Sequence, residues 1–307
     1  MSSKKVAVVV PTLNASSLWD RWVEGMRAQR FKPEAVLIVD SDSDDDTVSR
    51  AEKEGYHVHA IRRSEFNHGG TRQAAVQMLE GMDIVVFLTQ DAILASEDSI
   101  GELVDSFKDE SVGAAYGRQL PRREAGPLEA HARLFNYPGS SSRQTGQDIP
   151  RLGLKTAFIS NSFSAYRVAA LKAVGGFPNH VIVSEDMHVA ARMIVAGWAV
   201  HYNADAVVEH SHGYTPFQEF QRYFDVGVFH SRERWILEKF GAPSGEGLRF
   251  VLSEWKFLGP KGMILLPSSI IRTALKLIGY HMGRQEPRIP LALKRRISMQ
   301  KSFWRSH

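Results

Sequence analysis

The sequence predicts an α/β fold in which a mostly parallel sheet is flanked by helices. Residues 6–10, 35–39 and 83–92 form short apolar runs rich in β-branched residues. Runs of this length and composition are typical of strands buried on both faces of a parallel sheet. Segments with helical periodicity separate the runs, which gives the βαβ order that parallel pairing requires.

The first two predicted strands each lead into a polar loop. Residues 6–10 are followed by Pro11-Thr12-Leu13-Asn14, and residues 35–39 end at Asp40. In open α/β sheets, ligands bind outside the carboxyl ends of the strands. Both loops are therefore candidate binding segments. The acids at 44–46 suit the first turn of a helix over residues 47–55.

A strand-like segment at residues 56–61 leads into Phe66-Asn67-His68-Gly69-Gly70-Thr71-Arg72 and a helix that continues through Leu79. The two glycines would allow the backbone to approach a ligand closely. The helix N-terminus would offer free amide hydrogens to an anion, with Arg72 beside them. A Gly-Gly turn alone does not identify a ligand.

Asp91 follows the most apolar predicted strand. Its position suits a residue that holds a charged substrate or a metal ion. The alternative is a side chain that only caps the next helix, predicted at residues 98–109. A short strand is then expected at 113–116.

Residues 117–154 are polar and basic and contain proline and glycine. This composition predicts a long functional loop or lid over the site. Regular structure is expected to resume at 156–162 and to continue with a helix over 167–174.

Two further clusters combine groups that can carry chemistry. Glu185 and Asp186 open an amphipathic helix, where adjacent acids can also act simply as charges that complement the helix dipole. His210-Ser211-His212 follows a predicted strand. A His-x-His pair can bind a metal, although spaced histidines are also common as surface residues.

Composition limits the possible functions. The 307 residues, 43% hydrophobic and 23% charged, indicate an ordinary globular protein of one large or two smaller domains. The absence of cysteine excludes disulfides, thiolate zinc sites and cysteine nucleophiles, and fits a reducing compartment. The N-terminus lacks the features of a signal peptide, so we expect an unprocessed protein that is not secreted.

The C-terminal region has two interpretations. Residues 262–282 are apolar but contain Pro267, Arg272 and Lys276, which makes a membrane span improbable. Ile271 and Ile278, with Leu275 and Met282, fall on one helical stripe, and basic residues follow it. The segment is either an amphipathic helix packed on the main domain or a peripheral attachment to an anionic membrane surface. Because no other part of the chain is basic and rich in aromatic residues, nucleic-acid binding is not expected.

In chain order, these motifs resemble the family 2 inverting glycosyltransferases, which have the Rossmann-like GT-A fold. The Phe-Asn-His-Gly-Gly-Thr-Arg and Thr-Gln-Asp-Ala segments are similar to bacterial rhamnosyltransferases that build O-antigen and related polysaccharides from dTDP-L-rhamnose. The resemblance implies a catalytic domain at residues 1–235 and a helical, basic extension at 236–307. It divides the catalytic domain into a nucleotide-sugar-binding half (1–115), the loop or lid (117–154) and an acceptor and catalytic-base half (155–235).

The resemblance also implies roles for individual residues. Asp186 is implied as the catalytic base, and Asn161 and Glu185 are implied to contact the acceptor. The metal ligands are Asp91 and one of His210 and His212, because Asp91 matches the last acid of the family's Asp-x-Asp motif. The implied donor-binding residues are Pro11, Thr12, Asn14, Asp40, Asn67, Gly70, Arg72, Gln90 and Asp91, with Asp40 on the base.

The chain departs from the family pattern at Thr89, which replaces the first acid of Asp-x-Asp as it does in the rhamnosyltransferase branch. We therefore expect modest metal affinity. The segment 218–222 also lacks the Gln-x-x-Arg-Trp motif of processive synthases, which favours transfer of single sugars.

Chemistry supports the same roles. A leaving diphosphate needs charge stabilisation, which a divalent cation supplies, and a carboxylate with a neutral imidazole and phosphate oxygens suits Mg or Mn. An acceptor hydroxyl must lose its proton as it attacks, which requires a base such as Asp186 on the opposite face of the sugar. One displacement of this kind inverts the anomeric centre.

The leading hypothesis is a cytoplasmic, metal-dependent inverting rhamnosyltransferase that acts on a polyprenyl-linked or lipopolysaccharide-core acceptor. Peripheral attachment to the cytoplasmic face of the inner membrane is one location that this hypothesis allows. One alternative is the same fold with a UDP-sugar donor. The other is a non-catalytic membrane-surface partner built on a transferase fold that has lost its activity.

Overall fold

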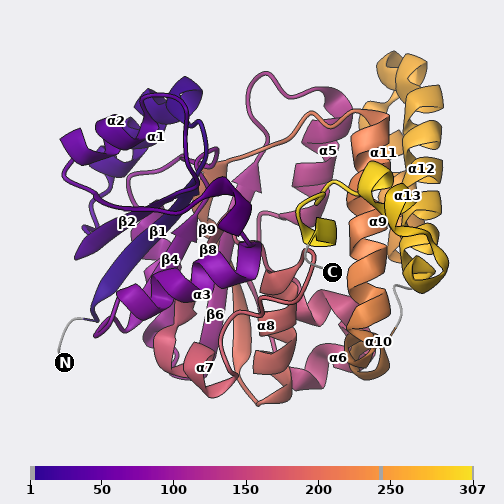
Figure 1. Ribbon diagram of the computed structural model, residues 1–307. Coiled ribbons are helices and arrows are strands. Elements are labelled where there is room, and N and C mark those ends of the chain that lie inside the picture. Colours follow the sequence, from indigo (N-terminus) through magenta and orange to yellow (C-terminus); the bar gives the residue numbers. More distant parts are fainter. Residues whose placement is uncertain (1–3, 242–244, 306–307) are drawn as a thin grey trace.

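A computed structural model describes residues 4–241 and 245–305. These residues form a nine-stranded sheet with the strand order β3-β2-β1-β4-β8-β6-β9-β5, in which β7 also pairs with β9 (Figure 1). The strands are β1 (Val6–Thr12), β2 (Ala35–Asp40), β3 (His57–Ala60), β4 (Ile84–Leu88), β5 (Ile93–Leu94), β6 (Val112–Leu120), β7 (Ser142–Gln144), β8 (Phe163–Arg167) and β9 (Ala199–Glu209).

The sheet is mostly parallel, as the sequence predicts. β1 pairs in parallel with β2 and β4, β2 pairs in parallel with β3, and β6 pairs in parallel with β9. β8 runs antiparallel between β4 and β6, and the short β5 and β7 run antiparallel to β9. The carboxyl ends of β1, β2 and β4 therefore meet at one edge.

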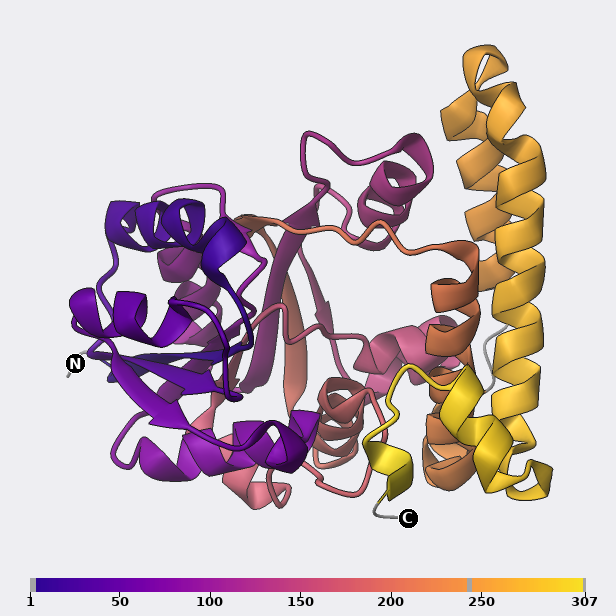
Figure 2. The same cartoon turned by 45° about the horizontal axis from the view of Figure 1, so that its top comes forward.

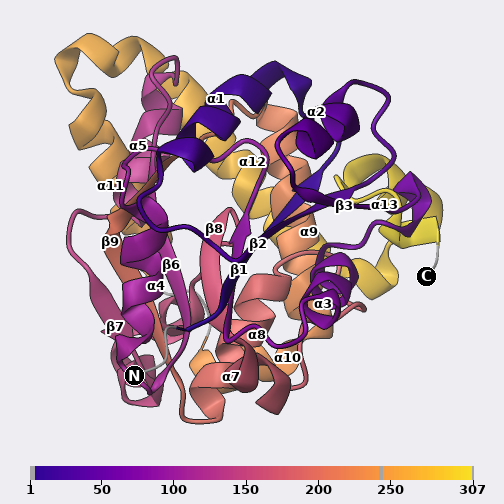
Figure 3. The same cartoon turned by 90° about the vertical axis from the view of Figure 1, so that its left-hand side faces the viewer.

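Helices cover both faces of the sheet (Figures 1 and 3). Alternate residues of β1 separate two cores, since Val8 and Val10 contribute to one core and Val9 to the other. The first core includes side chains of α1 (Ser16–Ala28), α2 (Thr47–Lys53) and α4 (Ser99–Asp105). The second includes side chains of α3 (His68–Met78), α7 (Val168–Ala173), α8 (Glu185–Val195) and α9 (Pro216–Arg232).

Residues 117–154 are not the long loop that their composition predicts. β6 continues to Leu120, and the segment also holds α5 (Pro127–Asn136), β7 and α6 (Ile149–Leu152). Pro127 occupies the first turn of α5, where its missing N–H is not needed. β7 is defined by its pairing with β9, a long-range contact that local composition does not reveal. A lid function for this segment remains a prediction.

The chain after residue 233 adds α10 (Arg234–Phe240), α11 (Glu246–Leu258), α12 (Leu266–Arg284) and α13 (Leu291–Ile297). α11 and α12 form a hairpin whose far end extends past the rest of the molecule (Figures 1 and 2). The segment then returns to the main domain, where Phe303 and Trp304 join the core that contains α8 and α9. The proposed boundary at residues 235 and 236 remains a prediction.

The closest contacts of α12 with α9 are made by small residues, and of the predicted apolar stripe Met282 packs against the core that contains α9 side chains. A Cβ on Gly283 would lie 2.0 Å from the Phe224 carbonyl oxygen, and one on Gly279 would lie 2.4 Å from that of Phe220. Helix backbones approach this closely only where side chains are absent. Ile271 and Ile278 of the predicted stripe are instead exposed.

Among the described residues, the helical stretch Gly262–Arg284 is long and apolar enough to cross a membrane, by length and composition alone. The three residues that we expected to interrupt it do not break the helix. Pro267 lies in the first turn of α12, where proline is tolerated, and Arg272 and Lys276 both pair with Glu219 of α9. Length and composition remain weak evidence for a span.

Candidate active site

Three adjoining cavities lie around the loops that follow the sheet strands. The first cavity (≈ 710 Å³) includes Pro11, Thr12, Gln90 and Asp91 in its lining, and the second (≈ 270 Å³) includes Asp186. The third (≈ 390 Å³) includes His212. The first and second share His68, Arg72 and Thr89, and the second and third share Tyr214 and Arg222.

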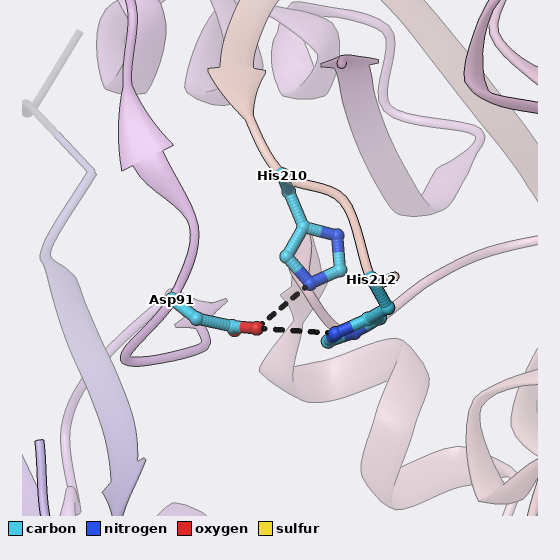
Figure 4. A group of neighbouring side chains, drawn as sticks. All are labelled: Asp91, His210 and His212. Atoms are coloured by element: carbon cyan, nitrogen blue, oxygen red, sulfur yellow. Dashed lines mark ion pairs between the residues drawn. The ribbon is translucent and has the colours of Figure 1, made fainter. Parts of the chain in front are cut away.

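The predicted metal ligands come together (Figure 4). Asp91 Oδ2 lies 3.3 Å from His210 Nε2 and 3.6 Å from His212 Nδ1. One ligand atom from each of the three residues lies within 4.8 Å of the others. Asp91 follows β4 and the histidines follow β9, so the sheet brings together residues that are 119 positions apart or more.

Gln119 orients His210. The Gln119 Oε1 accepts a hydrogen bond from Arg133 Nη1 (2.6 Å) and lies 2.9 Å from His210 Nδ1, which therefore carries the proton and donates. The Nε2 lone pair is then directed toward Asp91. Histidines that bind a metal through one ring nitrogen usually donate a hydrogen bond from the other, and His210 is the more deeply buried of the two histidines.

The protonation states fit a cation. Burial opposes ionisation of Asp91, but the contact with His210 holds the pKa of Asp91 well below its usual value. Burial lowers the pKa of His210, and burial with the neighbouring His210 lowers the pKa of His212 to about 3. One carboxylate and two neutral imidazoles suit a divalent cation such as Mn²⁺.

Asp40 and Asn14 shape the loops of the first cavity. Asp40 is buried and accepts hydrogen bonds from Thr12 Oγ1 (2.9 Å) and from the backbone N–H and hydroxyl of Ser43. Asn14 accepts one from the Asp44 N–H. Neither Asp40 nor Asn14 is part of the cavity lining, so a direct contact of either residue with the donor remains a prediction.

Gln90 connects two of these loops. Its amide oxygen accepts from the Leu13 N–H (2.7 Å) and its amide nitrogen donates to the Leu13 carbonyl (3.0 Å). This pair of bonds fixes the loop after β1 against the loop after β4. Gln90 also lines the first cavity.

The Gly69-Gly70 pair serves packing in this structure. A Cβ on Gly69 would lie 1.7 Å from the Pro178 carbonyl oxygen, so the glycine admits backbone of the chain itself and not a ligand. Asn67 caps α3 by accepting from the Gly70 N–H (2.7 Å). Asn67 and Gly70 lie outside the lining of the first cavity, whereas Arg72 lines both the first and the second.

Glu185 and Asp186 have different environments. Glu185 is buried, forms an ion pair with Arg72 and accepts a hydrogen bond from Asn161 Nδ2 (3.0 Å). Asp186 accepts from the Asn161 N–H (3.2 Å) and the Met187 N–H (2.8 Å). Burial and the neighbouring Glu185 charge raise the pKa of Asp186 to about 7. A carboxyl with such a pKa is suited to accept a proton near neutral pH.

The backbone just before this pair is strained. Ser184 has φ of 61°, in the left-handed region that is unfavourable for a residue with a side chain. Strain of this kind persists where the surrounding structure enforces it and is common at functional sites.

A second group of possible ligands, His180, His188 and Glu233, lies apart from these cavities. Glu233 contacts both histidines through their Nε2 atoms, whereas His188 Nδ1 is buried without a hydrogen-bond partner. Glu233 lies 3.1 Å from His180 Nε2 and accepts a hydrogen bond from Trp235 Nε1 (2.9 Å). Glu233 therefore has partners within the protein.

Comparison with known families decides the class of protein. The family model described as "Glycosyltransferase like family 2" matches residues 4–235. The chain is a family 2 glycosyltransferase. The resemblance inferred from the motifs is confirmed, and so is the assignment as an enzyme.

Two curated relatives match this glycosyltransferase over nearly their whole lengths. It is 46% identical to the O-antigen chain rhamnosyltransferase RfbN of Salmonella typhimurium, over 98% of this chain and 96% of that protein. It is 47% identical to the O-antigen chain rhamnosyltransferase WbaN of Salmonella anatum, over 97% of this chain and 95% of that one.

A solved structure shares the fold. The mannosyltransferase PcManGT of Pyrobaculum calidifontis, determined in complex with GDP-Man and Mn²⁺, gives a TM-score of 0.58 at 18% identity, covering 99% of this chain and 86% of that one. The likeness supports the predicted GT-A architecture.

The glycosyltransferase site also contains residues that sequence reasoning missed. Arg122 donates to the Asp91 carbonyl (2.6 Å), and Gln119 and Arg133 support His210. The basic composition of residues 117–154 was the available signal for the two arginines. Arg63 and Arg305 line the first cavity, and Arg305 could not be found from sequence because it reaches the site only through the folded C-terminal segment.

Proposed function

We propose that this enzyme is an inverting rhamnosyltransferase that moves single L-rhamnose residues from dTDP-L-rhamnose to a saccharide acceptor in O-antigen synthesis. One observation supports the transfer chemistry. Asp91 and Asp186 line two adjoining cavities, and Arg72 lines both. The rhamnose assignment is supported by the names of the two nearly full-length relatives.

Asp186 acts as the general base. The acceptor hydroxyl oxygen forms a bond to the anomeric carbon while the bond from that carbon to the diphosphate oxygen breaks. The hydroxyl proton passes to the Asp186 carboxylate, and the bonding electrons leave with the nucleoside diphosphate. Attack from the face opposite the leaving group inverts the anomeric centre, and the raised pKa of Asp186 is suited to this proton transfer.

Cationic side chains hold the donor diphosphate. Arg63, Arg72 and Arg305 line the first cavity with Asp91, so a diphosphate there meets several positive charges. Asp91, His210 and His212 would hold a divalent cation, Mg²⁺ or Mn²⁺, which neutralises charge that develops on the leaving diphosphate.

The acceptor is lipid-linked, and the enzyme works at the cytoplasmic face of the inner membrane. Of the eighteen large apolar side chains exposed in the described part of the chain, twelve lie between residues 248 and 293. Residues 246–305 also contain twelve Lys and Arg against three acids. An apolar surface combined with excess positive charge suits an anionic bilayer.

The test is a calorimetric titration of the purified enzyme with dTDP-rhamnose, dTDP and UDP, each with and without Mn²⁺. The proposal expects binding that depends on Mn²⁺ and prefers the dTDP ligands. Preference for UDP would keep the transferase but contradict the donor assignment. Absence of binding to all three ligands would favour a non-catalytic protein.

A further inference from the structure

The third cavity lies between the catalytic domain and the C-terminal hairpin. It is lined by Arg133 of α5, Tyr223 of α9, Glu254 of α11 and Arg272 of α12, and by the loop that follows β9. Neither the donor nor the general base is placed in it, so its role is open.

This cavity is connected to the reacting groups. Tyr214 and Arg222 line it and also line the second cavity, which contains Asp186. His212 of the metal-binding group contributes to its lining as well. In the other direction, Leu265 and Ser268 bring the lining to the start of α12, on the hairpin that carries the exposed apolar side chains.

The lining contains unused hydrogen-bonding capacity. Glu219 Oε1 lies 3.1 Å from Arg272 Nη1 and 3.6 Å from Lys276 Nζ, but its Oε2 is buried without a partner. Arg133 Nε is also buried without a partner. Buried polar atoms without partners are costly, so a ligand that supplies both donors and acceptors would be stabilised there.

The charge and shape of the lining favour a sugar over a polyanion. Four cations, Arg133, Arg222, Arg272 and Lys276, face three carboxylates, Glu129, Glu219 and Glu254. The near balance gives little net attraction for a diphosphate. Tyr214 and Tyr223 add amphipathic rings, and hydroxyl groups of a saccharide can both donate to Glu219 and accept from Arg133.

We infer that the third cavity binds the saccharide part of the acceptor, with the receiving sugar at the second cavity and the remainder directed toward the α11–α12 hairpin. Glu219 is the residue that selects the acceptor, through its free carboxylate oxygen. The inference rests on the proposed transferase function and assigns the acceptor to a surface separate from the donor cavity.

The absence of cysteine from the sequence permits a selective block. Thr273 lines the third cavity, and Met78 of α3 is an exposed residue outside the three cavities. Thr273→Cys and the control Met78→Cys are each labelled with a bulky maleimide. Three quantities are then measured: binding of dTDP with Mn²⁺, release of dTDP from dTDP-rhamnose in water, and transfer to decyl-diphosphate-linked hexosides as soluble acceptor probes.

We expect labelled Thr273→Cys to lose transfer at least tenfold while dTDP binding and hydrolysis of the donor stay unchanged. Labelled Met78→Cys should bind dTDP, hydrolyse the donor and transfer rhamnose like the unlabelled protein. Transfer by labelled Thr273→Cys at the rate of the unlabelled protein would overturn the inference. If the unlabelled protein binds no dTDP, or transfers rhamnose to none of the probes, the proposed function fails instead.

Glu219→Gln tests the selecting residue. The amide keeps the shape and one oxygen but replaces the free carboxylate oxygen. We expect the KM for the accepted hexoside probe to rise about tenfold, as for loss of a hydrogen bond to a charged group, with the KM for dTDP-rhamnose unchanged. An equal rise in both KM values would indicate a general structural effect and would contradict the selecting role.

Discussion

The Arg72 guanidinium lies 2.9 Å from Oε1 of Glu185, and both side chains are buried. Although burial opposes ionisation, the charge of Arg72 lowers the pKa of Glu185 and keeps this carboxylate charged. That fixed charge, after burial, is the second cause that raises the pKa of Asp186. Of two adjacent acids, Glu185 is therefore committed to an ion pair, and Asp186 remains available to exchange a proton.

Asp186→Asn should lower kcat by about 10²–10⁴-fold, the usual contribution of a general base, because an amide cannot accept the acceptor proton. Affinity for dTDP in the presence of Mn²⁺ should not change, since Asp186 lies outside the donor cavity. Steady-state kinetics and calorimetry of the same preparation measure the two effects. Turnover at the wild-type rate would show that the base is another group.

The pH dependence of turnover should reflect the same carboxyl. Because Asp186 must be ionised to accept a proton and its pKa is about 7, kcat/KM should fall about tenfold per pH unit below 7 and level off above it. Initial rates at saturating Mn²⁺ across pH 5 to 9 measure the profile. A flat profile between pH 5 and 7 is the contradicting outcome.

The contribution of Asp186 to the free energy of unfolding should fall as pH rises, whereas turnover rises. The folded protein keeps the Asp186 proton up to about pH 7, whereas an unfolded aspartate loses it near pH 3.8. This carboxyl's contribution is thus present below pH 3.8 and lost as pH rises through 7. The amide side chain that Asp186→Asn introduces does not titrate. As pH rises from 5 to 8, the unfolding free energy of this variant, measured by urea denaturation, should therefore increase relative to that of the wild type. If the unfolding free energies of the variant and the wild type changed equally with pH, the raised pKa of Asp186 would be contradicted.

His210→Ala should weaken Mn²⁺ binding in the presence of dTDP more than loss of the Gln119 contact does. Gln119→Leu, which removes the acceptor for His210 Nδ1, should weaken it about 10–100-fold. His57→Ala, at an exposed position of strand β3, is the matched control. Calorimetry measures all three variants. Unchanged Mn²⁺ affinity in His210→Ala would remove this residue from the ligand set.

Gly69→Ala should destabilise the protein by at least about 2 kcal/mol, because its Cβ would overlap the Pro178 carbonyl oxygen. The adjacent Gly70→Ala should change stability by less than about 1 kcal/mol, since its nearest contact is 3.3 Å away, at the Asn67 side chain. Urea denaturation compares the pair. Equal stability of the two variants would contradict the packing role of Gly69.

Ile264, which is 86% exposed near the end of the hairpin, is the best residue with which to test membrane attachment. Ile264→Asp should reduce sedimentation with phosphatidylglycerol-containing vesicles at least about tenfold, because it replaces an apolar side chain that would enter the bilayer. Met78→Asp, an exposed apolar position on α3, should bind like the wild type. An equal loss of vesicle binding in both variants would contradict membrane attachment through the hairpin.

Part of the site could be predicted from sequence because local patterns encode it. The buried strands are short apolar runs, and each places its terminal polar residues at one edge once the strands pair in parallel. Asp91 and Asp186 both line cavities there. The glycines were harder to interpret, since Gly69 contacts Pro178, and a contact between residues far apart in the chain leaves no local signal.

The sequence by itself determined the βαβ architecture and the family and indicated candidate metal ligands and a candidate base, because periodicity and motif order depend on neighbours in the chain. The tertiary structure decided how the two adjacent acids differ, since the Arg72 ion pair keeps Glu185 charged while burial and that charge raise the pKa of Asp186. It also decided that Gln119 orients His210 and that the C-terminal segment returns Arg305 to the first cavity. Such assignments depend on distances and solvent exclusion, which exist only after distant segments have packed.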